Sequence, residues 1–345
     1  MMGTGTFAEP TFEALLAAFP ESVVGLFTQP EREGVKQRGS TRQTGKGMAN
    51  IARAANVPVA QPESVNAPDG LAQLQEMRPD LLVVAAYGQI LSKDVLSAPT
   101  RGTINVHASL LPKYRGAAPV AYSILNGDAE TGVTIIKVTP GLDSGDMISQ
   151  EAIPIAADDT TGSLEAKLAA LGARMAVDAA HKYATGGAVE GTKQDAALVT
   201  KAPKIKKEFG LIDWTKPAAY IERFVRAMQP WPTAYTFLHR PGKEPMRVIV
   251  NAVEVAETMR EEDGELPPGG LLFDTSWGAN PNSGELLGLL QPGATAEAIH
   301  VCCGNNTTLR IVALQPAGKK RLSATEFLRG HPLTIAAEFG PEVLA

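Results

Sequence analysis

Two polar side chains at the end of an apolar run are the first candidates for chemistry. Asn105 and His107 close the run Thr103–His107, which predicts a buried strand. Because successive side chains of a strand point to opposite faces, these two leave the same face. An amide N–H and an imidazole N–H can together stabilise a carbonyl oxygen that becomes negative during acyl transfer. The pair also fits two strand-end residues that only hydrogen-bond backbone, and this strand alone leaves both interpretations open.

A carboxylate further along the chain can complete such a site. Asp143 follows the predicted strand at residues 133–138, in a loop where Gly141 and Gly145 permit tight turns. We expect this loop at the carboxyl edge of a parallel sheet, the same edge as His107. There Asp143 can fix the tautomer of His107 and order a water molecule that takes a proton from an attacking amine. The alternative is an ordinary turn aspartate.

The first half of the chain alternates short apolar runs with amphipathic segments. This alternation is typical of a mostly parallel sheet covered by helices. The predicted strands are residues 23–28, 81–87, 103–107 and 133–138, and the predicted helices are residues 10–18, 47–55, 71–77, 119–126 and 163–183. We therefore expect an α/β fold in which residues 1–190 form a doubly wound, Rossmann-like catalytic domain.

The second half has a different pattern. A chain of 345 residues exceeds the usual size of one domain. Residues 191–208 lack apolar periodicity and contain several lysines, which predicts a basic linker. Short strands then recur at intervals that suit a small β-barrel of the OB type over residues 209–345. These strands are residues 234–238, 246–255, 270–273, 298–303 and 309–314, and a Gly-, Pro- and Asn-rich stretch at 274–295 is expected to be an inserted loop.

The composition limits the class of protein. Hydrophobic residues make up 44% and charged residues 20% of the chain, and no apolar run has the length of a membrane span, so we expect a cytoplasmic globular protein. Cys302 and Cys303 are adjacent, which excludes a disulfide framework and a structural zinc site, and we expect no metal. The net charge of -5 by itself argues against a nucleic-acid partner.

The ordered set Asn105-Val-His107, Ser109-Leu-Leu-Pro112 and Asp143-Ser-Gly145 resembles the folate-dependent formyltransferase family. The resemblance implies that Asn105, His107 and Asp143 are the catalytic residues and that 10-formyltetrahydrofolate donates the formyl group. It also implies a folate site formed by Ser109, Leu110, Leu111 and Pro112 together with Tyr87, Gly88 and Leu91.

Other segments resemble the branch of this family that acts on methionyl-tRNA. They are Phe27–Pro30, Tyr114–Pro119, Pro230–Pro232 and Leu314–Lys320. The resemblance implies initiator methionyl-tRNA as the partner, and we expect a monomer. Two alternatives stay open: a formyltransferase that acts on a nucleotide sugar or another small amine, and a non-catalytic RNA-binding protein with the same fold.

Local basic groups agree with a tRNA partner in spite of the acidic total, because phosphates respond to nearby cations. The predicted tRNA contacts are Arg32, Lys36, Arg38, Arg42 and Lys46 in a polar loop, with Lys204, Lys206 and Lys207 in the predicted linker. A merely solvated loop is the alternative.

The beginning of the chain departs from the family pattern. Relatives carry a full apolar strand before the turn at Gly3-Thr-Gly5, whereas only Met1 and Met2 precede Gly3 here. In a doubly wound sheet this strand is central, and its loss would expose the edges of its neighbours. We therefore expect the start of translation to lie upstream of Met1.

Overall fold

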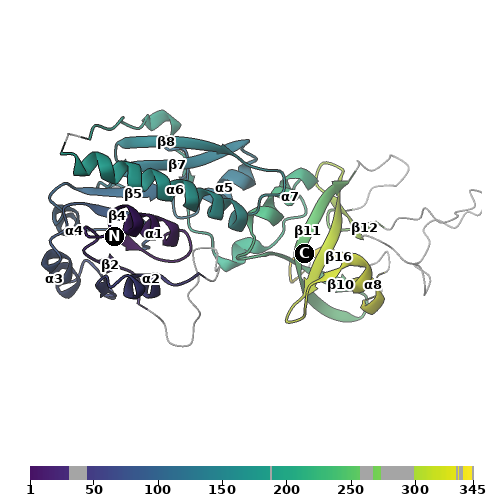
Figure 1. Ribbon diagram of the computed structural model, residues 1–345. Helices are drawn as coiled ribbons and strands as arrows, with labels where there is room; N and C mark the ends of the chain where they lie inside the picture. Colours follow the sequence, from purple (N-terminus) through teal and green to yellow (C-terminus); the bar gives the residue numbers. More distant parts are fainter. Residues whose placement is uncertain are drawn as a thin grey trace, which may run out of the picture. The chain divides into compact units, whose positions relative to one another are not determined.

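The computed structural model describes residues 1–30, 45–186, 189–256, 267–272, 299–331, 333 and 337–343. The chain divides into two compact units, Met1–Ile205 and Lys206–Ala345 (Figure 1). Within these described ranges, no helix has the length and apolar character needed to cross a membrane.

The first unit is built on a seven-stranded sheet in the order β3-β2-β1-β4-β5-β7-β8. Its strands are β1 (Met2–Gly3), β2 (Leu26–Phe27), β3 (Val59–Ala60), β4 (Leu82–Ala85), β5 (Thr103–His107), β7 (Glu130–Lys137) and β8 (Met147–Pro154). The strands from β3 to β5 in this order are parallel, and β7 and β8 are antiparallel to their neighbours. The expected α/β class with a mostly parallel sheet is confirmed, and the two-residue β1 lies inside the sheet, between β2 and β4.

Six helices surround this sheet in the described part of the first unit. They are α1 (Glu9–Ala18), α2 (Met48–Ala54), α3 (Pro68–Glu76), α4 (Lys93–Ser97), α5 (Pro119–Asn126) and α6 (Thr161–Ala184). α6 begins with a capping box, in which Thr160 and Ser163 satisfy each other's backbone N–H groups. α6 lies along β5 and β7, with α1 and α5 beside it (Figure 1).

Packing under α6 decides which way the candidate side chains of β5 point. Gly172 of α6 lies so close to β5 that a Cβ atom there would be 2.6 Å from Val106 Cγ1. Val106 therefore faces α6, and its neighbours Asn105 and His107 leave the opposite face of the strand. The close approach of helix and strand fixes the position of β5 behind the candidate site.

The direction of β7 corrects one sequence-based expectation. β7 pairs antiparallel with β5, with Lys137 opposite Ile104 and Thr134 opposite His107. The carboxyl end of β7 thus lies beside the amino end of β5, so the argument that placed Asp143 at the carboxyl edge of a parallel sheet was wrong. The loop after β7 has to fold back along β5 to bring Asp143 to His107.

Residues 189–205 complete the first unit. The segment contains the short helix η1 (Ala196–Leu198) and the strand β9 (Lys201–Ala202), which pairs in parallel with β6 (Arg115–Gly116). In the structure, much of the predicted linker is thus hydrogen-bonded to residues that follow the Ser109–Pro112 loop.

The second unit is an antiparallel sheet in the order β12-β13-β14-β11-β10-β16, with β15 beside β14. Its elements are η2 (Lys207–Gly210), α7 (Ala218–Ala227), β10 (Ala234–Arg240), β11 (Lys243–Ala256), β12 (Leu271–Leu272), β13 (Ile299–Cys303), β14 (Thr307–Pro316), β15 (Leu322–Ser323), α8 (Ala324–Gly330) and β16 (Glu338–Gly340). A bridge between Gly270 and Glu338 joins the two ends of the sheet, so the expected barrel is nearly closed. The predicted inserted loop, 274–295, lies outside the described residues.

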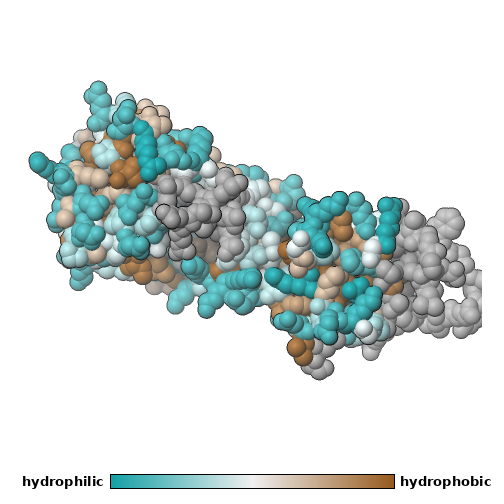
Figure 2. Space-filling model, turned by 90° about the horizontal axis from the view of Figure 1, so that it is seen from below, coloured by the Kyte–Doolittle hydropathy of each residue, from teal (hydrophilic) through white to brown (hydrophobic). Residues whose placement is uncertain are grey.

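Hydrophilic residues cover most of the face of the chain that Figure 2 presents, and smaller hydrophobic patches interrupt them. The helix α7 is amphipathic: its apolar residues Ile221, Phe224 and Val225 are buried, which leaves mainly polar residues on its outer face. Buried apolar residues occur in both units, so each unit has an apolar core of its own. Examples are Phe12 and Ile104 in the first unit and Val248 and Phe327 in the second.

We predict that Gly172→Leu destabilises the first unit by about 1–3 kcal/mol, because the larger side chain has to displace Val106 or push α6 away from β5. Thermal unfolding of the full chain measures the effect. Ala170→Leu is the control, since Ala170 is an exposed residue of the same helix. Equal unfolding temperatures for the two variants would contradict the packing described for α6.

Candidate active site

His107 is buried, and protein groups face both of its ring nitrogens. Nε2 lies 3.0 Å from the backbone oxygen of Tyr114. A carbonyl oxygen only accepts, so Nε2 carries the hydrogen and donates it. Nδ1 lies 3.7 Å from Oδ2 of Asp143. This distance suits an ion pair but is too long for a direct hydrogen bond. Nδ1 is thus the ring nitrogen that faces the carboxylate.

A backbone donor holds the Asp143 carboxylate in place. The backbone N–H of Gly116 donates to Asp143 Oδ2 at 2.8 Å. Gly116 has φ +126°, and a Cβ atom there would be 2.5 Å from Ala202 O, so glycine is required for this approach. Asp143 itself has φ 45°, a left-handed conformation that non-glycine residues seldom adopt. Such backbone strain persists where surrounding contacts enforce it.

Asn105 lies on the same face of β5 as His107 and is partly exposed. Within the described ranges, no hydrogen-bond partner of its side-chain amide is found. The amide is therefore free to donate to a substrate oxygen. The structure brings His107 and Asp143 together and presents Asn105 on the same face. An amide and an imidazole on one face are groups that can stabilise the oxyanion of acyl transfer.

Thr134 of β7 organises the loop after β5. Its buried hydroxyl donates to Ser109 O at 2.6 Å and accepts from the backbone N–H of Leu111 at 3.1 Å. Gln150 of β8 donates to Leu111 O at 2.8 Å and to the same hydroxyl at 2.9 Å. The Ser109–Pro112 segment is thus fixed by side chains from two antiparallel strands.

The predicted folate-site residues differ in what they offer to a ligand. The side chains of Ser109, Leu111, Tyr87 and Leu91 are buried, and the last two belong to the apolar core around β4. Only Leu110 and Pro112 are partly exposed, while Gly88 is exposed. The buried residues can therefore contact a ligand chiefly through backbone atoms.

Two exposed apolar side chains near these positions were missed by the sequence analysis. Ile90 is 79% exposed and lies two residues after Gly88, and Leu142 is 65% exposed and precedes Asp143. A large apolar side chain exposed beside a polar site marks a surface that a ligand can cover. In the sequence, only their positions next to predicted site residues indicated that these two side chains could contact a ligand.

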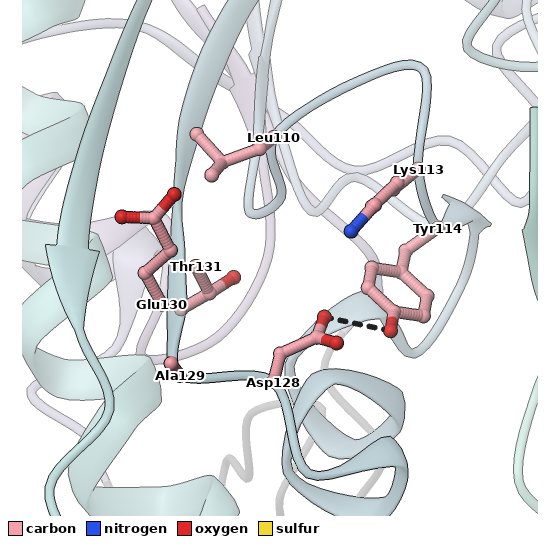
Figure 3. A pocket seen from close by; sticks show the side chains of 7 residues that line it. All are labelled: Leu110, Lys113, Tyr114, Asp128, Ala129, Glu130 and Thr131. Atoms are coloured by element: carbon pink, nitrogen blue, oxygen red, sulfur yellow. Dashed lines mark hydrogen bonds between the residues drawn. The ribbon is translucent and has the colours of Figure 1, made fainter. Parts of the chain in front are cut away.

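A hollow of about 120 Å³ lies beside the site rather than at its centre (Figure 3). It is lined by Leu110, Lys113, Tyr114, Asp128, Ala129, Glu130 and Thr131, so none of the three candidate catalytic residues contributes to it. Burial raises the pKa of Tyr114 to about 12, and its hydroxyl donates to Asp128 at 2.7 Å. This bond anchors the residue whose carbonyl accepts from His107.

The predicted tRNA contacts fall into two groups. Arg32, Lys36, Arg38 and Arg42 lie outside the described residues. Lys46 is described, and its ammonium forms an exposed ion pair with Glu13 at 2.6 Å. Lys204, Lys206 and Lys207 are exposed, which leaves their charges available to a phosphate.

In the described ranges, no group of three or more His, Cys, Asp or Glu side chains is placed to hold a metal ion.

Comparisons with known proteins cover both units. The family described as "Formyl transferase" matches residues 1–180, and "Formyl transferase, C-terminal domain" matches residues 204–332. The methionyl-tRNA formyltransferase of Acidithiobacillus ferrooxidans (strain ATCC 53993 / BNL-5-31) is 42% identical over 98% of this chain and 97% of its own. That of Citrifermentans bemidjiense is 40% identical over 96% of this chain and 93% of its own.

A solved structure shares the fold at low sequence identity. It is the N-formyltransferase from Helicobacter canadensis in complex with folinic acid and dTDP-3-aminofucose, with a TM-score of 0.59 and 16% identity, and the match covers 91% of this chain and 97% of that one.

We predict that Thr134→Val lowers stability by about 1–3 kcal/mol, because Ser109 O and the Leu111 N–H lose their buried partner. For a domain of this size, each kcal/mol corresponds to about 2–4 °C in unfolding temperature. Thr103→Val is the matched control, since Thr103 Oγ1 is buried without a hydrogen-bond partner in the described part of the chain. An equal effect of both changes would show that the Thr134 hydroxyl does not fix the loop.

Proposed function

The chain belongs to the formyl transferase family, and we propose that it transfers the formyl group of 10-formyltetrahydrofolate to the α-amine of methionyl initiator tRNA. The product, N-formylmethionyl-tRNA, starts translation, so the proposed place of action is the cytoplasm. The observation that carries the chemistry is the pairing of His107 with Asp143 on the face of β5 that also presents Asn105. The identity over nearly the full length with methionyl-tRNA formyltransferases supports the choice of acceptor.

The reaction moves a formyl group without any change of oxidation state. The amine forms a bond to the formyl carbon, the bond from that carbon to folate N10 breaks, and one proton passes overall from the amine to N10. The negative charge that develops on the formyl oxygen is stabilised by Asn105 Nδ2–H and, when the ring carries a second proton, by Nδ1–H of His107. Nδ1 has this role because Nε2 donates to Tyr114 O. Asp143 accepts the proton from the amine through a water molecule.

The residues fit a folate donor, which supplies the activated formyl group. Ile90 and Leu142 offer exposed apolar surface that a flat ring system can cover. We propose that the folate is bordered by polar and apolar groups from two segments. They are the backbone at Tyr87, Gly88 and Leu91, and the Ser109–Pro112 loop. Thr134 and Gln150 hold this loop in place through hydrogen bonds to the backbone of Leu111.

The tRNA contacts are proposed from charge. Lys204, Lys206 and Lys207 are exposed cations within four residues of one another, and cationic contacts to phosphates dominate the affinity for nucleic acids. The loop that carries Arg32, Lys36, Arg38 and Arg42 is proposed as a second phosphate contact, with Lys46 at its end. A chain with a net charge of -5 needs such local groups to bind a polyanion.

One assay separates this proposal from its main alternative, a formyltransferase that acts on a sugar. The purified chain is given 10-formyltetrahydrofolate with methionyl initiator tRNA, methionyl elongator tRNA or a nucleotide-linked amino sugar. We expect transfer to initiator tRNA, with kcat/KM lower for the elongator tRNA. Transfer to the amino sugar alone would refute the proposed acceptor, and no transfer to any of the three would refute the reaction.

We predict that Asn105→Ala lowers kcat for formyl transfer by about a hundredfold or more, because one donor to the developing oxyanion is lost. The KM values for folate and tRNA should change little, since the amide acts mainly in the transition state. Steady-state kinetics with initiator tRNA measure both parameters. An unchanged kcat would remove Asn105 from the proposed catalytic residues.

We predict that the double variant Lys206→Ala/Lys207→Ala raises the KM for tRNA and leaves kcat unchanged. The slope of log KM against log salt concentration should fall by about 2, since each phosphate contact contributes about 1. Lys93→Ala/Lys182→Ala is the control, with the same change in charge at exposed positions outside the proposed contacts. If the control pair had the same effect, total charge rather than these lysines would explain the binding.

A further inference from the structure

The segment that follows α6 is attached to the loop that carries Asp143. Thr192 and Met147 exchange two backbone hydrogen bonds, at 2.8 and 2.9 Å. Gly191 lies against Asp146, since a Cβ atom there would be 2.7 Å from Asp146 Cβ. The chain then continues past Gln194 to β9, whose pairing with β6 places it beside Gly116. The segment therefore contacts the Asp143 loop at its end and the Gly116 donor as well.

Gln194 connects these elements through both ends of its carboxamide. Nε2 donates to Asp143 O and to Gly145 O, each at 2.8 Å. Oε1 accepts from Arg115 Nε at 3.0 Å and from Arg115 Nη2 at 2.7 Å. The amide thus donates twice and accepts twice, which uses its hydrogen-bonding capacity fully. Gln194 and Arg115 are both partly buried, so water competes less for these bonds than at an open surface.

One of the two carbonyls that accept from Gln194 belongs to Asp143, the residue with the strained backbone, and the other lies two residues later, at Gly145. Asp143 has φ 45°, and the loop closes tightly at Gly145, where a Cβ atom would be 1.7 Å from Lys137 O. A left-handed non-glycine residue relaxes when its neighbours do not hold it. Relaxation at Asp143 would rotate its side chain, and Oδ2 would leave Gly116 N and His107 Nδ1.

From this geometry we propose that Gln194 is a positioning residue for formyl transfer. Its carboxamide fixes the backbone at Asp143 and thereby holds the carboxylate against His107. Arg115 in turn orients the carboxamide, because its guanidinium donates to Oε1 and so directs the Nε2 donors to the loop. The inference rests on the proposed function, since it concerns the carboxylate that the proposed reaction uses.

Gln194→Met tests the proposal with a side chain of similar size that lacks the donors. We expect kcat for formyl transfer to fall about tenfold to a hundredfold, as displacement of a catalytic group by about 1 Å does, while both KM values stay within about twofold. Gln229→Met is the matched control. Gln229 of the second unit also donates from Nε2 to two backbone carbonyls, Val225 O and Asn251 O, and is also partly buried.

Gln194→Glu separates positioning of Asp143 from a merely structural bond to Arg115. The glutamate keeps the acceptor for the guanidinium but turns an oxygen toward Asp143 O and Gly145 O. We expect it to be at least as impaired as the methionine variant. Restoration of kcat by glutamate would overturn the proposal, because the bond to Arg115 would then suffice.

A double-mutant cycle on kcat with Asp143→Asn gives the decisive measurement. Once the carboxylate is absent, Gln194→Met should cost less than about twofold. An equal cost in both backgrounds would overturn the proposal. Transfer by the unaltered chain, and the decrease of kcat in Asp143→Asn, test the proposed function separately, so failure of one claim can be told from failure of the other. Thermal unfolding of each variant in the cycle verifies that folded protein is compared.

Discussion

The Asp143 carboxylate accepts the Gly116 N–H at 2.8 Å and lies 3.7 Å from His107 Nδ1, and the proposed chemistry depends on this placement. A carboxylate that is fixed beside the imidazole before the substrate binds needs no reorganisation when charge develops during the reaction. The arrangement demands a glycine at position 116 and a left-handed backbone at Asp143. Both features cost stability or chain freedom, which is common where a site stores strain for function.

The fold supports this placement from two sides. Behind β5, the contact between Gly172 and Val106 sets the strand against α6 and turns Asn105 and His107 to the other face. In front, the loop after the antiparallel β7 folds back along β5, and residues 189–202 hold it there. Thr200 of the same segment accepts the backbone N–H of Tyr114, the residue whose carbonyl orients His107. One segment thus contacts the surroundings of both His107 and Asp143.

The availability of positive charges for a polyanion also depends on local structure. The chain is acidic in total, but binding to a polyanion depends on cations that lie close to phosphates. Lys204, Lys206 and Lys207 lie on the surface, whereas Lys46 already shares its charge with Glu13. The negative net charge therefore does not exclude a nucleic-acid partner. The exposure of each lysine, and whether a carboxylate already pairs with it, decide whether it can bind a phosphate.

Much of the fold follows from local pattern. The bounds of β5 and α5 were predicted to the residue. β-Branched residues favour a strand in β5, and the proline at the start of α5 is a residue type that favours the first turn of a helix. The helix α8 was missed although Ser323 and Glu326 form a capping box that the sequence displays. β8 was missed because it is an edge strand without a buried residue, and its apolar residues lie in pairs at both ends of the strand instead of alternating with polar ones.

Residue type and spacing made Asn105, His107 and Asp143 candidates, because side-chain chemistry and the two-residue period of a strand are local properties. The resemblance to a family then favoured a catalytic role over ordinary strand-end and turn residues. The tertiary structure decided how Asp143 reaches His107, since the direction of β7 depends on pairing between distant segments. It also decided the place of Gln194, whose partners are backbone carbonyls about 50 residues away and carry no mark in the sequence. Contacts to backbone are independent of residue type, so only the folded chain reveals them.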